Sequence, residues 1–124
     1  MFDRSTLTVL AAALALPAIA HAGGDPAKGA TLFKQRCGIC HVSTEGAKPS
    51  IAPNLFGLVG RKAASTGFSY SDAMKASGLT WSPAELDGFL TAPNKKVPGT
   101  RMMISVPAAP DRTDIIAYLS SLKK

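Results

Sequence analysis

Hydrophobic residues recur with helical spacing in three segments of the chain. The apolar positions are Ala30, Phe33 and Cys37 in the first segment, Leu86, Phe89 and Leu90 in the second, and Ile115, Ile116, Leu119 and Leu122 in the third. Residues three or four positions apart share one face of an α-helix. The pattern therefore predicts three amphipathic helices, each with one face in a common core.

Residues that cap helices mark the ends of the first and last segments. Asp25 followed by Pro26 is typical of an N-cap and a first helical residue, which predicts a helix from there to about Arg36. Gly29 lies on the buried face of this helix, where glycine costs about 1 kcal/mol relative to alanine and permits close packing. Asp111 is the expected N-cap of the last helix, which leads to the C-terminal lysines.

The middle of the chain combines clear helix signals with a long irregular stretch. Ser82-Pro83-Ala84-Glu85 is a capping box with proline at the first helical position, and Pro93 is expected to stop the helix that follows. A shorter helix is predicted over 71–77, with Gly78 after its end. Residues 42–70 show neither helical nor strand spacing, which is uncommon inside a compact domain. We therefore expect something other than protein to fill the middle of the molecule.

The chain begins with an apolar segment that has the pattern of a secretory signal. Arg4 precedes a nearly continuous apolar run from Leu7 to Ala20, and Ala20-His21-Ala22 has the small-x-small pattern that signal peptidase accepts. The run is shorter than the roughly 20 residues that span a bilayer, and an uncleaved anchor is the alternative. We expect residues 1–22 to be a cleaved signal peptide and residues 23–124 to form one domain in the periplasm.

The composition of the expected domain limits what it can be. The 124-residue chain has 2 cysteines, 2 histidines and a net charge of +6, and only His41 of the histidines lies after residue 22. All 11 glycines and most of the 9 prolines also lie there, which is typical of a loop-rich protein. The domain is too short for most multi-domain enzymes and has too few cysteines for a disulfide scaffold. A protein core of this size, without a cofactor, contributes only a small margin of stability.

Cys37-Gly38-Ile39-Cys40-His41 is a C-x-x-C-H motif, which attaches c-type haem. Two thiols near a helix end can add to the two vinyl groups of one haem, and the adjacent His41 is then carried to the iron. A thioredoxin-like dithiol is the first alternative, but the βαβ pattern that accompanies it is missing. A structural zinc site is the second, and it needs four ligands of cysteine and histidine type where the domain has three. The motif therefore predicts a covalent haem, which also fills the space around which irregular chain can pack.

The second axial ligand decides between an electron carrier and a catalyst with an open iron site. No second histidine remains in the domain, so the candidates are Met74, Met102 and Met103. Met102 follows Pro98-Gly99-Thr100-Arg101, a turn that can hold one side chain in a fixed place, and Met103 is its main rival. A thioether opposite histidine raises the reduction potential and suits one-electron transfer.

The chain resembles the class I cytochromes c, of the mitochondrial and bacterial c2/c550 kind, from about Asp25 to Leu122. The matching stretches are Gly29-x-x-x-Phe33, the C-x-x-C-H motif, Ala52-Pro53-Asn54-Leu55-x-Gly57-Leu58-x-Gly60-Arg61-Lys62, Gly67-Phe68-Ser69-Tyr70, Thr80-Trp81, Pro98-Gly99-Thr100-Arg101-Met102 and Ile116-Ala117-Tyr118-Leu119. The resemblance implies the small cytochrome c fold, which is all-α, with three to five helices and long loops around one covalent haem.

The resemblance also implies a role for each matching residue. Cys37 and Cys40 would form the thioether links, and His41 and Met102 would bind the iron. The carbonyl group of Pro53 would accept a hydrogen bond from the ring of His41 and so fix its tautomer. Three side chains would contact the haem propionates: Arg61, Tyr70 and Trp81. Thr100 would support the same edge or the methionine loop, and the helix crossing would be formed by Gly29, Phe33, Ile115 and Tyr118.

Two positions depart from the family pattern. Phe89 stands where a tyrosine commonly donates a hydrogen bond to the methionine sulfur, and Met74 stands where the mitochondrial branch usually has asparagine. Both changes make the pocket more apolar while leaving the ligand set intact. We expect them to act on the reduction potential and on the stability of the distal loop.

These observations favour an electron carrier over the alternatives. The expected function is one-electron transfer in the periplasm by a monomer that is neither an enzyme nor embedded in a membrane, within a respiratory or related chain. Its expected partners are acidic docking surfaces of redox proteins, such as a bc1-type complex, a terminal oxidase or a periplasmic dehydrogenase, and not nucleic acid. The cations expected to surround the haem edge are Arg36, Lys48, Lys62, Lys95, Lys96 and Arg101. A haem peroxidase or gas-binding protein with an open iron site is the alternative.

Overall fold

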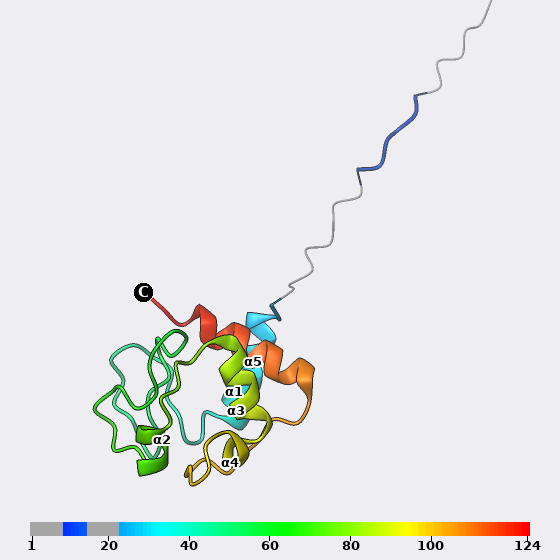
Figure 1. Ribbon diagram of the computed structural model, residues 1–124. Helices are drawn as coiled ribbons and strands as arrows, with labels where there is room; N and C mark the ends of the chain where they lie inside the picture. The colour runs from blue at the N-terminus through cyan, green and yellow to red at the C-terminus, as the bar shows by residue number, and fades with distance from the viewer. Residues whose placement is uncertain (1–8, 15–22) are drawn as a thin grey trace, which may run out of the picture.

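The computed structural model describes residues 9–14 and 23–124, and its helices are joined by long loops (Figure 1). The helices are α1 (Pro26–Arg36), α2 (Asp72–Ala76), α3 (Pro83–Thr91), α4 (Pro93–Lys96) and α5 (Ala109–Ser121). Within the described ranges the only β pairing is an isolated bridge between Lys62 and Thr80. The predicted all-α class with three to five helices is confirmed.

The expected signal peptide, residues 1–22, falls outside the described residues except for 9–14, which form no helix or strand. In the ranges that are described, no helix has both the length and the apolar character to cross a membrane.

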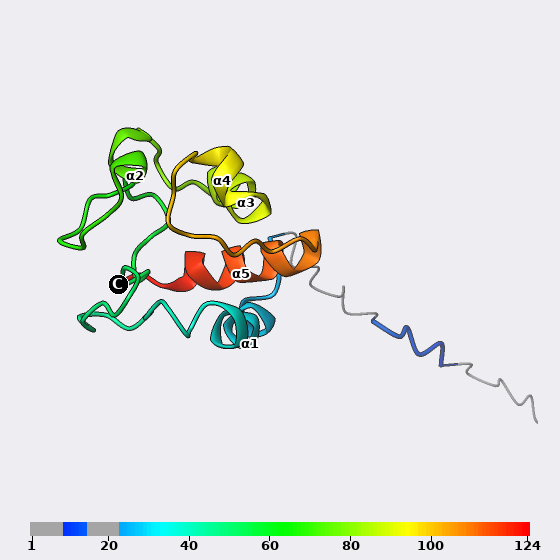
Figure 2. The same ribbon diagram turned by 90° about the horizontal axis from the view of Figure 1, so that it is seen from below.

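α1 and α5, which lie far apart in the sequence, pack against each other and cross (Figure 2). Gly29 of α1 sits directly against α5, because a Cβ atom there would lie only 1.9 Å from the carbonyl oxygen of Asp114. The ring of Phe33 lies 5.3 Å from that of Tyr118, measured between centroids. The predicted helix crossing and the role of Gly29 in it are confirmed.

The hydrophobic core is formed by α1 and α3, which each pack against α5, and by loop residues. Its buried side chains are Phe33, Leu58, Trp81, Leu86, Phe89, Leu90, Val97, Val106, Ile115, Ile116 and Leu119. These include most of the apolar positions that the helical spacing predicted to be buried. The fourth contributor to this core is irregular chain, because Leu58, Val97 and Val106 all belong to loops.

The predicted caps of α1 and α3 are confirmed, whereas the helix predicted over 71–77 is shorter, with Ser71 and Ser77 as its caps. The carboxylate of Asp25 accepts hydrogen bonds from the first-turn amides of Ala27 (2.9 Å) and Lys28 (3.3 Å). The hydroxyl of Ser82 accepts one from the amide of Glu85, and Ser71 caps α2 in the same way. α2 ends before Gly78, whose φ of +66° suits glycine.

The predicted start of the last helix needs correction, and one short helix was not predicted. α5 begins two residues before Asp111, and Asp111 is not its N-cap but lies in its first turn, where it pairs with Arg36 at 3.1 Å. Pro110 already has the φ of a helix, so the helix extends N-terminally past it. Pro93 does end α3, but it also starts the short helix α4, which the sequence pattern did not predict.

The loops between α1 and α3 are held by main-chain hydrogen bonds rather than by regular structure. The stretch around Arg61 pairs with the stretch around Trp81, where Trp81 N donates to Arg61 O at 2.9 Å and Gly60 N donates to Trp81 O at 2.8 Å. Leu55 N donates to Val42 O, and Gly57 N reaches Leu122 O beyond the end of α5. These bonds fix the loops on one side of the core, where they surround the candidate site.

Candidate haem site

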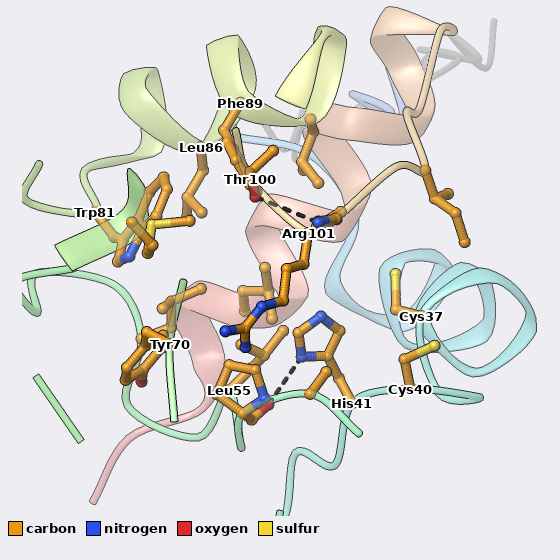
Figure 3. Close-up of a pocket in the computed structure, with 18 of the residues that line it drawn as sticks. Cys37, Cys40, His41, Leu55, Tyr70, Trp81, Leu86, Phe89, Thr100 and Arg101 are labelled. Atoms are coloured by element: carbon orange, nitrogen blue, oxygen red, sulfur yellow. Dashed lines mark hydrogen bonds between the residues drawn. The ribbon is translucent and has the colours of Figure 1, made fainter. Parts of the chain in front are cut away.

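A cavity of about 420 Å³ opens between the end of α1, α3, α5 and the loops (Figure 3). All nine residues predicted to bind a cofactor line it: Cys37, Cys40, His41, Pro53, Arg61, Tyr70, Trp81, Thr100 and Met102. The remaining lining is mainly hydrophobic and includes Phe33, Leu58, Leu86, Leu90 and Ile115. Its size and apolar walls are those of a site for a small molecule or cofactor.

The motif residues lie together on the α1 side of this cavity, facing Trp81, Leu86 and Phe89 across it (Figure 3). Cys37 is the C-cap of α1, and the following turn is closed by hydrogen bonds from Cys40 N and His41 N to Cys37 O. Both cysteines are free and half-buried. Burial raises the pKa of the Cys37 thiol to about 11, against the opposing effect of the Arg36 charge. The thiol of Cys37 is therefore protonated at neutral pH.

The ring of His41 is held in one tautomer by its hydrogen bond to the next loop. Its Nδ1 atom lies 2.8 Å from the carbonyl oxygen of Pro53. A carbonyl oxygen can only accept, so Nδ1 carries the proton and the lone pair of the imidazole is on Nε2. Burial lowers the pKa of His41, and the bond to Pro53 opposes this in part. The resulting tautomer is the one that presents Nε2 to a metal.

Of the three candidate distal methionines, Met74 and Met102 are half-buried and Met103 is exposed. Met102 is half-buried and packs against the hydrophobic core, whereas the side chain of Met103 is 76 % exposed. Met102 N donates to the hydroxyl of Thr100 at 3.3 Å, and Thr100 is itself buried. Met74 also lines the cavity, from α2. Contact with the hydrophobic core thus distinguishes Met102 from Met103.

The polar residues predicted at the propionate edge occupy one wall of the cavity. Trp81 is buried, and its main chain pairs with that of Arg61. The guanidinium of Arg61 donates to the carbonyl oxygens of Phe56 (3.1 Å) and Asn54 (3.2 Å), which leaves donors free for an acidic group. The hydroxyl of Tyr70 bonds to that of Thr66 at 2.6 Å.

The two departures from the family pattern also face this cavity. Phe89 is buried with its ring centroid 5.1 Å from that of Trp81, and Met74 packs against the core. Neither side chain carries a donor, so these two positions contribute only apolar surface to the pocket.

Asn54 is a residue whose contribution the sequence reasoning missed. Its side-chain amide donates to the carbonyl oxygens of Thr44 (2.8 Å) and Ala47 (3.0 Å), and its oxygen accepts from Phe56 N. It therefore ties the loop after the C-x-x-C-H motif to the loop that carries Pro53. The only signal was an asparagine before Leu-Phe-Gly, which is typical of a turn.

The residues that line the cavity fit a c-type haem. Two thiols, one neutral imidazole and one thioether reach the cavity together with an apolar lining and an arginine with unused donors. Imidazole and thioether are the axial pair of electron-transferring haem proteins, and an apolar wall suits the porphyrin plate.

Comparison with known proteins decides the family. The model of the Cytochrome c family matches residues 26–123. The chain belongs to the cytochrome c family. Cytochrome c2 of Rhodomicrobium vannielii is 48 % identical over 117 residues, which cover 93 % of each protein. Cytochrome c of Theileria annulata is 48 % identical over 97 residues, covering 77 % of this chain and 84 % of that protein. Cytochrome c2 of Rhodoblastus acidophilus is 48 % identical over 102 residues, covering 81 % and 94 %.

Family membership establishes the cofactor and the kind of activity. Cytochromes c carry one c-type haem bound covalently through a cysteine pair, which in this chain is Cys37 and Cys40. They are haem-based electron carriers and not enzymes. The predicted resemblance, the predicted cofactor and the non-enzymatic role are confirmed.

Proposed function

We propose that the chain is a periplasmic one-electron carrier in which His41 and Met102 are the axial ligands of the haem iron. The observation that carries this proposal is the contrast between the half-buried Met102, which packs against the core, and the exposed Met103 next to it, in a cavity that also holds a histidine fixed in one tautomer. When bound, the haem supplies reversible one-electron oxidation and reduction of its iron. With both axial positions filled by side chains, substrates have no access to the metal.

The residues of the chain then have distinct tasks around that group. Pro53 keeps the proton of His41 on Nδ1, Thr100 supports the main chain of Met102, and Trp81 closes the cavity wall. Arg61, Tyr70 and Trp81 are proposed to offer donors to the propionates. For Tyr70 this requires its hydroxyl to exchange its bond with Thr66 for one with an acidic group.

The mouth of the cavity has the character of a docking face. Three exposed apolar side chains line it, Ile51, Met103 and Ile104. Arg36, Lys62 and Arg101 line it as well. An apolar centre with surrounding positive charge suits brief association with acidic surfaces of redox enzymes, which are the proposed partners. Of the six predicted cations, Arg36 and Lys96 are partly neutralised by ion pairs with Asp111 and Glu85, at 3.1 and 2.5 Å.

Periplasmic location is proposed from the pattern of residues 1–22, with cleavage after Ala22. The mass of the mature holoprotein tests this directly. A protein that starts at Gly23 and carries one haem is expected, and a haem protein that keeps residues 1–22 would show that the segment is an anchor.

The test of the axial ligands uses the purified holoprotein and two matched methionine variants. The oxidised wild-type protein should show the sulfur-to-iron charge-transfer band. Met102→Ala should abolish the band, lower the reduction potential and let the reduced protein bind carbon monoxide. Met103→Ala, the control one residue away, should do none of these.

Two results would contradict the proposal. A band lost in Met103→Ala but kept in Met102→Ala would assign the ligand to the neighbouring residue. Carbon monoxide binding by the reduced wild-type protein at neutral pH would favour an open iron site, as in a peroxidase or gas-binding protein.

A further inference from the structure

Arg112, in the first turn of α5, joins three parts of the chain through one guanidinium group. Its Nε donates to the Asp87 carboxylate of α3 at 2.8 Å. Its Nη1 donates to the carbonyl oxygens of Val106 (3.0 Å) and Pro107 (2.8 Å). The Arg112 side chain is only 11 % exposed, whereas that of Asp87 is 50 % exposed, so the guanidinium is largely buried while its partners lie partly at the surface. No pattern in the sequence pointed to this residue.

Val106, which Arg112 holds, is the C-terminal anchor of the segment that carries Met102. It is 1 % exposed, and its amide donates to Leu90 O of α3 at 2.8 Å. Both main-chain polar groups of Val106 are therefore bound. At the other end of the segment Val97 is 3 % exposed, and its amide donates to Pro93 O. Met102 thus lies on a span between two buried fixed points.

Between these points Thr100 is buried, and its amide donates to Val97 O at 3.0 Å, which links it to the N-terminal anchor. The other contacts are exposed: Arg101 donates to Ser69 O at 2.8 Å, and Gly99 N donates to the side chain of Asn94 at 3.2 Å. After Met102 the next buried residue is Val106, so on its C-terminal side the position of Met102 depends on the Val106 anchor, which a charged side chain holds.

We infer that Arg112 is a positioning residue for Met102, acting through the carbonyl groups of Val106 and Pro107 and not through contact with the cofactor. Arg112 does not line the cavity. The inference rests on the proposed ligation by Met102. If it holds, loosening this guanidinium clamp releases the thioether from its place even when the helices stay folded.

Only the planar guanidinium of an arginine can make the contacts with Asp87, Val106 and Pro107 at the same time. A guanidinium has five donors in one plane, and here Nε and Nη1 serve a carboxylate and two carbonyl oxygens at once. Lysine presents a single ammonium point on a flexible stem and cannot reproduce this arrangement. Arg112→Lys therefore keeps the positive charge next to Asp87 while breaking the hold on Val106.

The experiment is a titration of the oxidised holoprotein with imidazole. Binding is measured as the loss of the sulfur-to-iron charge-transfer band. Imidazole can reach the iron only when the methionine has left, so its apparent affinity rises in proportion to the population of the released state. We expect Arg112→Lys to raise this affinity about tenfold, equivalent to about 1.4 kcal/mol. Asp87→Asn, which keeps the guanidinium and both carbonyl groups, should raise it less.

Tyr118→Phe is the matched control, because it removes a hydrogen bond of the same helix that does not involve Val106. Tyr118 bonds to Ser43 at 2.9 Å, on the α1 side of α5. This variant should lower the urea midpoint and leave the imidazole affinity within twofold of the wild-type value. Should Arg112→Lys yield no holoprotein, the same titration is made on Arg112→Gln, whose amide can still donate to one carbonyl group.

The outcomes separate the inference from the function on which it rests. If the Arg112 variant loses stability but binds imidazole like Tyr118→Phe, the residue is only a clamp between α3 and α5 and the inference is overturned. An Asp87→Asn effect as large as that of Arg112→Lys would overturn it too. If Met102→Ala leaves the band of the wild-type protein intact, the assignment of the ligand fails instead, whatever Arg112 does.

Discussion

Replacing Gly29 with alanine measures what the close approach of α1 to α5 is worth. The new Cβ atom would lie 1.9 Å from the carbonyl oxygen of Asp114, 2.6 Å from its carbon and 2.8 Å from the Cβ of Tyr118. All three belong to backbone or to the stem of a side chain, so no rotamer change relieves the clash. Ordinary contact begins near 3.4 Å, which requires the helices to separate by about 1.5 Å.

Two opposing energies decide the outcome of this substitution. Alanine is the better helix former by about 1 kcal/mol. Overpacking costs roughly 1–3 kcal/mol, and the separation also weakens the dispersion contacts of Phe33 and Ile115 across the interface. We take the overpacking cost at the upper end, about 3 kcal/mol, and subtract the gain of about 1 kcal/mol from helix propensity. Gly29→Ala should therefore lower the free energy of unfolding by about 2 kcal/mol. For a domain of this size the melting temperature should fall by roughly 8–16 °C.

Urea unfolding of the holoprotein, followed by far-UV circular dichroism, provides the assay. Gly88→Ala in α3 is the control, because a Cβ there would meet nothing closer than Lys96 Cδ at 3.7 Å. This variant should gain up to about 1 kcal/mol of stability from helix propensity alone. A Gly29→Ala protein as stable as the wild type, or more stable, would refute the argument from close packing.

Three further predictions follow from contacts elsewhere in the domain. Asp25→Ala should cost about 1 kcal/mol in urea unfolding because it removes the acceptor for two first-turn amides, and no loss would mean that the cap is replaced by water. Ser43→Ala and Tyr118→Phe should each lower the free energy of unfolding by about 1 kcal/mol, because both remove the same hydrogen bond. The double variant should lose less than the sum of the two, and strict additivity would show that the bond contributes nothing. Electron transfer to an acidic redox partner should slow as ionic strength rises, and Lys62→Glu should slow it at low salt only; a rate independent of salt would exclude electrostatic steering.

Local chemistry made three of the helices predictable. Asp25, Ser71 and Ser82 each cap a helix with their own side chain, and the residues that follow have the right spacing, so the signal and its cause lie within a few positions of one another. α5 differs because no side chain caps it, and Ala108 stands at its N-cap. Its start has no capping side chain to mark it in the sequence, and Asp111 pairs with the distant Arg36 instead of capping.

The candidate site also contains residues that the sequence predicts and residues that only the structure shows. The C-x-x-C-H motif and the turn before Met102 could be found in the sequence because their spacing follows from the chemistry of one haem. Arg112 and Asn54 could not be found, because each acts by bonding to main-chain carbonyl groups that carry no side-chain signature. Only a folded chain shows which carbonyl groups lie within reach.

The pairing of α1 with α5 also sets an order of events in folding. The amide of Asp25 donates to the carboxylate of Asp114 at 2.8 Å, across 89 positions of sequence, and among the described helices α1 packs only against α5. The N-terminal part of a growing chain cannot complete this pairing until α5 has been made, because its packing partner is not yet there. Cys37 and Cys40 directly follow α1, so the segment that carries them is fixed in the domain only after the last helix is in place.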